Sequence, residues 1–247
     1  MKNYKMIIQY DGTRYSGWQV QKTTEDTIQG KIERILGQMT GHTVEIHGSG
    51  RTDAGVHAKG QVASVAIDDA FSGEEIRDYL NTYLPRDIAV LSVEQVDERF
   101  HARFSATGKT YLYRIHTGLA SDVFDRKFVY DYLIPLDVTR MREAAALLTG
   151  RHDFRSFCGN KHMKKSTVRT VSEIRIQELP SELRIYYTGE GFLMNMVRIL
   201  TGTLIEVGDG RREPESMTEI LAACDRDAAG FTAPPQGLCL EEVYYEK

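Results

Sequence analysis

The chain has 247 residues, of which 41% are hydrophobic and 27% charged, a composition typical of globular proteins with one or two domains. Its net charge of −4 argues against nucleic-acid binding through bulk charge. The longest apolar runs fall well short of the roughly 18 residues that a membrane span needs. Three distant cysteines, Cys158, Cys224 and Cys239, fit a reduced, cytoplasmic protein. The charged N-terminus, which passes straight into a strand pattern, is not expected to be a signal peptide.

The first half of the chain combines strand and helix patterns. Four strands are predicted, over residues 4–10, 43–47, 61–67 and 88–96. Apolar residues at helical spacing predict a helix over residues 28–39, with Gly41 as its stop. A capping box from Ser72 to Glu75 opens a second helix, which ends at Pro85.

The second half repeats this mixture of elements. Strands are predicted over residues 109–115, 171–177, 183–188 and 238–245, and the middle two form a hairpin around Pro180. Three helices are predicted, over residues 137–149, over residues 192–207 and in a short stretch capped by Ser216.

These elements lack the strict rhythm of parallel βαβ units. The predicted fold class is therefore α+β: two similar halves, each a mostly antiparallel sheet with helices packed on one side. We expect the junction near residues 101–108, which gives an N-terminal domain over 1–105 and a C-terminal domain over 106–247. An active-site cleft is expected between them.

Residues 48–58 (GSGRTDAGVHA) carry the most chemical information. Their glycines allow sharp bends and close approach of a bulky ligand. Asp53 is a lone carboxylate on a loop between two predicted strands, the kind of place where catalytic groups are concentrated. Arg51 is expected to keep Asp53 ionised, which suits a nucleophile. A surface hairpin whose aspartate caps a turn explains the local pattern equally well.

Several familiar catalytic motifs are absent. Asp53 stands where a dinucleotide fingerprint needs its third glycine, and the sequence has no phosphate-binding P-loop. An aspartic protease or a retaining glycosidase needs a second carboxylate, and the sequence nominates no partner for Asp53. The spacing of histidines and cysteines predicts no metal site.

Other residues have both a functional and a structural interpretation. Tyr111 offers a ring for stacking on an aromatic base, although strand tyrosines more often pack in a core. Arg198 lies in an apolar helical stretch, where it reaches solvent or needs an anionic partner. Trp18 is expected to be a packing residue. His57 is expected to tie the loop back through a ring hydrogen bond rather than to act as a catalytic base.

A basic segment over residues 151–175 interrupts the acidic chain, with seven Lys or Arg and two acidic residues. Such clusters contact phosphates, because neutralised phosphates release counterions. A solvated charged loop has the same composition, so the segment indicates phosphate binding only if it lies beside an active site. Its basic residues are Arg151, Arg155, Lys161, Lys164, Lys165, Arg169 and Arg175.

Several segments together resemble the tRNA pseudouridine synthase A (TruA) family. They are residues 10–13 (YDGT), 16–21 (SGWQVQ), 51–58 (RTDAGVHA), 104–114 (FSATGKTYLYR), 191–198 (GFLMNMVR) and 233–238 (APPQGL). The matches occur in order over nearly the whole chain, and the segment around Asp53 is the most specific. Cys239 departs from the family, which often has an aromatic residue there.

The resemblance implies an enzyme that isomerises uridine to pseudouridine at positions 38, 39 and 40 of the tRNA anticodon stem-loop. It implies a homodimer that needs no metal or cofactor. Asp53 would be the nucleophile, Tyr111 would stack on the target base, and Arg51 and Arg198 would complete the site. Two other classes stay open: a non-catalytic tRNA-binding module, and a hydrolase that uses Asp53.

Overall fold

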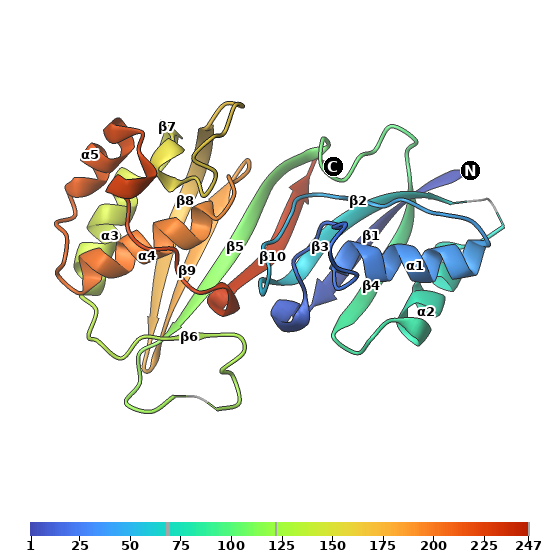
Figure 1. The fold of residues 1–247 in the computed structure, drawn as a ribbon, viewed down its shortest axis with the longest axis horizontal. Helices are drawn as coiled ribbons and strands as arrows, with labels where there is room; N and C mark the ends of the chain where they lie inside the picture. The colour runs from blue at the N-terminus through green and yellow to red at the C-terminus, as the bar shows by residue number, and fades with distance from the viewer. Residues whose placement is uncertain (68–69, 122, 247) are drawn as a thin grey trace. The chain divides into compact units, whose positions relative to one another are not determined.

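The structure, a computed structural model, describes residues 1–67, 70–121 and 123–246, and most of its strands pair antiparallel (Figure 1). It consists of two compact units, one of Met1–Thr107 with Cys239–Lys247 and a second of Gly108–Leu238. The α+β fold class is confirmed. Separate functional roles for residues 1–105 and 106–247 stay a prediction. No helix in the described ranges combines the length and apolarity needed to cross a membrane.

The sheet of the first unit is built around β1 (Lys2–Tyr10), whose alternate residues are buried because one face is covered. β3 (His57–Ile67) and β4 (Ile88–Val96) flank β1, and both are antiparallel to it. β10 (Leu238–Tyr245) pairs with β3 in parallel, through Cys239 opposite His57. The last strand of the chain therefore lies beside the strand that follows the Asp53 loop.

Local signals in the sequence set both helices of the first unit. α1 (Ile28–Thr40) begins after the N-cap Thr27 and ends at Gly41, whose φ of 79° places it in the left-handed region that glycine favours. α2 (Gly73–Tyr83) has the predicted capping box between Ser72 and Glu75. The two helices contact each other, and α2 packs against β4. These predictions are confirmed.

The predicted strand over residues 43–47 is wrong. Of these five residues, only His47 lies in a strand, the two-residue β2 (His47–Gly48), which pairs with β3. Side chains of α1 take the place of a strand partner: Glu33 Oε1 accepts the N–H of Ile46 (3.0 Å), and Gln29 Nε2 donates to the C=O of Ile46 (3.2 Å). The alternating pattern arises because Val44 and Ile46 are buried while their neighbours are exposed.

The sheet of the second unit has the order β5 (Ala106–His116), β9 (Glu182–Gly189), β8 (Val168–Leu179) and β7 (Gly150–Asp153), with every neighbouring pair antiparallel. β8 and β9 form the predicted hairpin. β6 (Tyr130–Asp131) adds a short parallel pair to β5.

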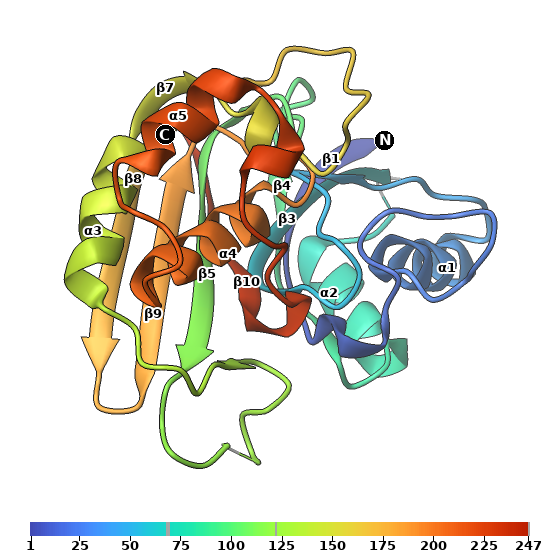
Figure 2. The same cartoon turned by 60° about the vertical axis from the view of Figure 1, so that its left-hand side comes forward.

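Three helices pack together in the second unit: α3 (Val138–Leu147), α4 (Met196–Gly208) and α5 (Ser216–Ala223). α3 contacts α4, α5 and β8, so the helices lie against one face of the sheet (Figure 2). Short 3-10 helices in the described residues are η1 (Gly12–Arg14), η2 (Arg155–Phe157), η3 (Arg226–Ala228) and η4 (Pro235–Gly237).

Two helix starts differ from the predictions. α4 begins at Met196 rather than near residue 192, because Asn195 has a φ of 58° and cannot continue a helix. Ser216 is the first residue of α5 rather than its cap, and its hydroxyl donates to the C=O of Glu213 (2.6 Å).

Gly202 on α4 is expected to be essential for packing in the second unit. A Cβ at this position would lie 1.9 Å from the backbone oxygen of Phe231. We expect Gly202→Ala to lower the free energy of unfolding by about 1–3 kcal/mol, because overpacking outweighs the better helix propensity of alanine. Urea unfolding measures the change. Gly191→Ala is the control, since its Cβ would meet open space; equal midpoints for the two variants would contradict the prediction.

Candidate active site

The Asp53 loop is held by the residue before the aspartate. Thr52 is buried, its hydroxyl shares a 2.8 Å hydrogen bond with the hydroxyl of Tyr10, and its C=O accepts the N–H of Trp18 (3.1 Å). Burial raises the pKa of Tyr10 and outweighs the opposing hydrogen bonds, so this hydroxyl stays neutral. With Thr52 turned inward, Arg51 is exposed and Asp53 is half-buried.

Backbone hydrogen bonds fix the loop on both sides of Asp53. Its C=O accepts the N–H of Val56 (3.1 Å), which closes a turn, and the N–H of Gly55 donates to the C=O of Tyr15 (3.2 Å). Gly55 has a φ of 77°, a conformation that glycine adopts without strain. The carboxylate therefore stands on a closed turn that rests on residues 10–18.

Gly55 provides the expected sharp bend, whereas Gly48 has a different role from the one expected. A Cβ on Gly48 would lie 2.5 Å from the indole nitrogen of Trp18, and a Cβ on Gly17 would lie 2.7 Å from the C=O of Thr52. Gly48 therefore makes room for Trp18, which is 2% exposed, rather than for a ligand. The prediction that Trp18 is a packing residue is confirmed.

His57 forms the ring hydrogen bond that the sequence predicts. It is 4% exposed, and its Nδ1 accepts the N–H of Gly12 (3.1 Å). Asp11 Oδ1 lies 3.3 Å from the same nitrogen. We assign the hydrogen bond rather than an ion pair, because a nitrogen that accepts from Gly12 has no proton to share with Asp11. His57 thus joins the end of the loop to the segment that supports it.

Arg51 is held by a neutral partner. Its Nε donates to Gln19 Oε1 (3.0 Å). Gln19 Nε2 in turn donates to Gln29 Oε1 (2.8 Å), and Gln29 Nε2 donates to Glu33 Oε1 (2.8 Å).

The sequence did not predict Gln19, Gln29 or Glu33 as residues of the site. A sequence signal was present for Gln29, because it lies next to Ile28 at the start of the predicted helix. In the structure its side chain is only 5% exposed. A buried amide needs hydrogen-bond partners. A polar residue at the buried end of an otherwise apolar helix face is the pattern that would have drawn attention to it.

Tyr111 lies on β5, in register with Tyr187 of β9. Its ring is buried and meets the ring of Phe192 edge-on, with centroids 5.3 Å apart. The hydroxyl of Tyr187 shares a 2.8 Å hydrogen bond with Thr201 of α4. Tyr111 therefore faces the side of the sheet that α4 covers, and stacking on a base stays a prediction.

Arg198 is half-buried in the first turn of α4, where a cation is disfavoured by the helix dipole. Its Nε donates to the C=O of Ala233 (2.7 Å), and its Nη1 donates to Asn195 Oδ1 (3.0 Å). These acceptors offset the unfavourable position and fix the guanidinium. Asn195, whose left-handed backbone conformation ends the loop before α4, therefore also supplies one of the two acceptors for Arg198.

The predicted site residues fall into two groups. Arg51 and Asp53 share one loop of the first unit, and Tyr111 and Arg198 belong to the second. Within the second unit, Tyr111 faces α4, the helix that carries Arg198. The structure thus provides a carboxylate on a fixed turn in one unit and, in the other, an aromatic ring on the side of the sheet covered by the helix that carries a fixed guanidinium.

Some of the basic side chains in residues 151–175 already have partners within the protein. Lys161 pairs with Asp227 (2.7 Å), and the guanidinium of Arg175 lies over the ring of Tyr186, 4.0 Å from its centroid. Lys164 and Lys165 are exposed.

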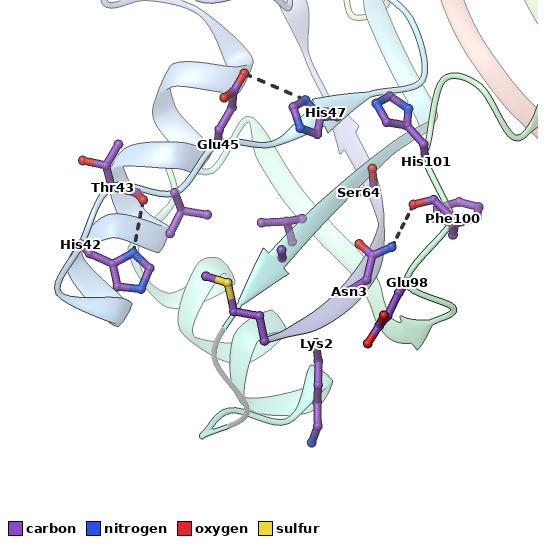
Figure 3. Close-up of a pocket in the computed structure, with 14 residues that line it drawn as sticks. Lys2, Asn3, His42, Thr43, Glu45, His47, Ser64, Glu98, Phe100 and His101 are labelled. Atoms are coloured by element: carbon purple, nitrogen blue, oxygen red, sulfur yellow. Dashed lines mark hydrogen bonds and ion pairs between the residues drawn. The ribbon is translucent and has the colours of Figure 1, made fainter.

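A pocket of 460 Å³ in the first unit is lined by none of the predicted site residues. Figure 3 shows His47, His101 and Glu98 around it. The rings of His47 and His101 stack with centroids 5.1 Å apart, and burial together with the charge of His47 lowers the pKa of His101. Across residues 1–67, 70–121 and 123–246, no three His, Cys, Asp or Glu side chains gather closely enough to hold a metal ion.

His57→Ala is expected to affect the support of the loop more than the chemistry. Loss of the acceptor for a buried N–H should lower the free energy of unfolding by about 1–3 kcal/mol. The catalytic rate should fall by no more than about tenfold, and the pH–rate profile should keep its shape. Urea unfolding and initial rates from pH 5 to 9 measure both, with the exposed His162→Ala as control. A thousandfold loss, or a missing limb near the ordinary histidine pKa of about 6.5, would make His57 catalytic.

Comparison with known proteins identifies the family. The family model described as tRNA pseudouridine synthase matches residues 6–105 and 144–246. The tRNA pseudouridine synthase A of Bacillus sp. (strain KSM-64) is 49% identical over 99% of this chain and 100% of its own length. That of Brevibacillus brevis (strain 47) is 46% identical with the same coverage. Among solved structures, a chain of "Crystal Structure of a Cbf5-Nop10-Gar1 Complex" aligns with a TM-score of 0.40 and 13% identity, over 82% of this chain and 45% of that one. A family model that spans most of the chain and relatives that match it end to end show that this chain belongs to the tRNA pseudouridine synthase family.

Proposed function

We propose that this chain isomerises uridine to pseudouridine at positions 38, 39 and 40 of the tRNA anticodon stem-loop, with Asp53 as the nucleophile. Family membership supports the reaction and the substrate class. The observation that carries the assignment of Asp53 is the fixed turn, in which buried Thr52 and the bond from Val56 hold a reachable carboxylate in place.

The reaction needs little beyond what these side chains offer. The N1–C1′ bond of the target uridine breaks, the base turns, and a C5–C1′ bond forms while C5 loses its proton and N1 gains one. Asp53 bonds to C1′ as the N1–C1′ bond breaks, and this Asp53–C1′ bond breaks again when C5 bonds to C1′, which releases the carboxylate. Atoms and charge balance without an oxidant or a reductant, which agrees with the proposal that no metal or cofactor takes part.

The other three residues act on the nucleotide around Asp53. Tyr111 stacks on the target base, and Arg198 supplies a fixed positive charge at the site. A uridine in a stem must leave its helix first, which costs a few kcal/mol. Arg51 fills the vacated space or holds a neighbouring phosphate, because its exposed guanidinium is suited to both.

Release of tritium from tRNA labelled at uridine C5 tests this function against its two alternatives. Isomerisation releases the label, because C5 loses its hydrogen when it bonds to C1′. Free uracil without such release would identify a hydrolase. Binding of tRNA with neither product would identify a non-catalytic binding module.

Asp53→Asn is expected to abolish tritium release and to leave tRNA binding within about threefold of wild type. The amide keeps the size of the side chain but is a far weaker nucleophile, whereas RNA affinity comes mainly from phosphate contacts spread over the surface. Asp78→Asn, on the exposed face of α2, is the control. Activity above about a hundredth of the wild-type rate would end the assignment of Asp53 as nucleophile.

We also propose that the basic segment over residues 151–175 contacts tRNA phosphates. The net positive charge of the segment supports this. Because Lys161 is paired with Asp227 and Arg175 packs on Tyr186, the exposed Lys164 and Lys165 are the proposed phosphate contacts. A homodimer is proposed on the family resemblance alone, and a cytoplasmic location on the three distant cysteines.

Lys164→Gln with Lys165→Gln should weaken tRNA binding and reduce the slope of log affinity against log salt by about two, or about one for each lost phosphate contact. Filter binding from 50 to 300 mM salt measures the slope. The control removes two exposed charges elsewhere in the same unit, by Arg126→Gln with Lys127→Gln. An unchanged slope in the first double variant would show that Lys164 and Lys165 are solvated and contact no tRNA phosphate.

A further inference from the structure

We propose that Gln19, Gln29 and Glu33 form a relay of positioning residues that aims Arg51 at the substrate; this inference rests on the proposed function. The three side chains connect α1 to the catalytic loop by successive hydrogen bonds of 2.8, 2.8 and 3.0 Å. None of them touches the reacting atoms in this proposal. They act through Arg51.

The relay has a fixed direction, which starts at Glu33. Its carboxylate can only accept, and it accepts from both Gln29 Nε2 and the N–H of Ile46. The amide of Gln29 must therefore present its nitrogen to Glu33. Its nitrogen also donates to the C=O of Ile46.

The orientation of Gln29 then decides the orientation of Gln19. With its nitrogen used, Gln29 presents its oxygen to Gln19 Nε2 and to the N–H of Val20 (3.2 Å). Gln19 is left with its own oxygen facing Arg51, which can only donate. Because this series of hydrogen bonds begins at a carboxylate that only accepts and ends at a guanidinium that only donates, both amides can have only one orientation of oxygen and nitrogen.

Arg51 is the residue that gains most from such a relay. It is exposed, and a free arginine side chain samples many rotamers. A bond at Nε fixes the plane of the guanidinium, and the two terminal nitrogens are then presented together. Two parallel donors match a phosphate or the edge of a base.

The side chain of Gln29 is buried and has more hydrogen-bond partners than a residue on the surface needs. It is 5% exposed and holds the backbone of Val20 and Ile46 as well as Gln19 and Glu33. Its partners are therefore set by the fold rather than by solvent, and the relay transmits the position of α1 to the loop. Gln19, half-buried between them, is the point at which the relay can be cut with least harm to folding.

The first test measures single-turnover tritium release at saturating tRNA, so that weaker binding does not enter. Gln19→Met, which removes the amide and keeps the shape, should lower the rate about tenfold, the value of one hydrogen bond to a charged group. Glu33→Gln should show a smaller loss in the same direction, because it allows the amides to reverse. Gln38→Met on the exposed face of α1 is the control, and its rate should stay at the wild-type value.

The decisive comparison is made in an Arg51→Met background. There Gln19→Met should have no further effect, because a residue that acts only through Arg51 has nothing left to position. A merely structural role would lower the rate equally in both backgrounds. A loss below threefold in Gln19→Met alone, or a similar loss with and without Arg51, would overturn the relay.

A second measurement is independent of activity. In ¹H–¹⁵N spectra of the protein without tRNA, the Arg51 Nε–H signal, identified by its absence in Arg51→Met, should exchange with water slowly. Gln19→Met should accelerate that exchange at least tenfold, while Gln38→Met should not. Fast exchange in the wild-type protein would overturn the relay even if tritium is released. Slow exchange without tritium release would overturn the proposed function and leave the relay intact.

Discussion

The inward turn of Thr52 is the constraint on which the rest of the candidate site depends. In a loop of this kind, consecutive side chains cannot all face the same way, so burying Thr52 turns Arg51 and Asp53 outward. The hydroxyl of Tyr10 and the N–H of Trp18 hold it there. Each bond contributes only about 1 kcal/mol net, but leaving a buried partner unsatisfied costs about 1–3 kcal/mol. The penalty for any other orientation is therefore larger than the bonds themselves suggest.

Residues 10–18 act as the support for this loop, and they can do so because they lie unusually close to it. Gly12, Gly17 and Gly48 are all at positions where a Cβ would meet another backbone or ring within 2.7 Å. His57 and Gly55 then fasten the far end of the loop to the same segment. The result is a loop outside the sheet that is held at several points along its length. A side chain placed this way keeps its geometry without the regular hydrogen bonds of a strand.

Signals within a few residues predicted the fold well, and contacts between distant residues were the source of the errors. The capping box at Ser72 and the stop at Gly41 depend only on neighbours, and both helices were predicted correctly. Residues 43–46 alternate like a strand, yet their backbone partners are side chains of α1, which no periodicity reveals. The left-handed Asn195 likewise depends on what surrounds it. Asp53 could be nominated from its motif, whereas Gln19 and Glu33 are ordinary polar residues until the fold brings them together.

The separation of Glu33 from Arg51 by two neutral amides has a physical advantage for a site that meets an anionic substrate. A carboxylate placed directly against Arg51 would fix the guanidinium equally well, but it would neutralise the charge and have to be displaced by a phosphate. An amide oxygen at Nε orients the guanidinium and leaves its full positive charge available. The carboxylate that sets the direction of the relay stays at the helix, where the N–H of Ile46 satisfies it further. Orientation is thus supplied by hydrogen-bond direction alone, and Gln19 does not neutralise the charge of Arg51.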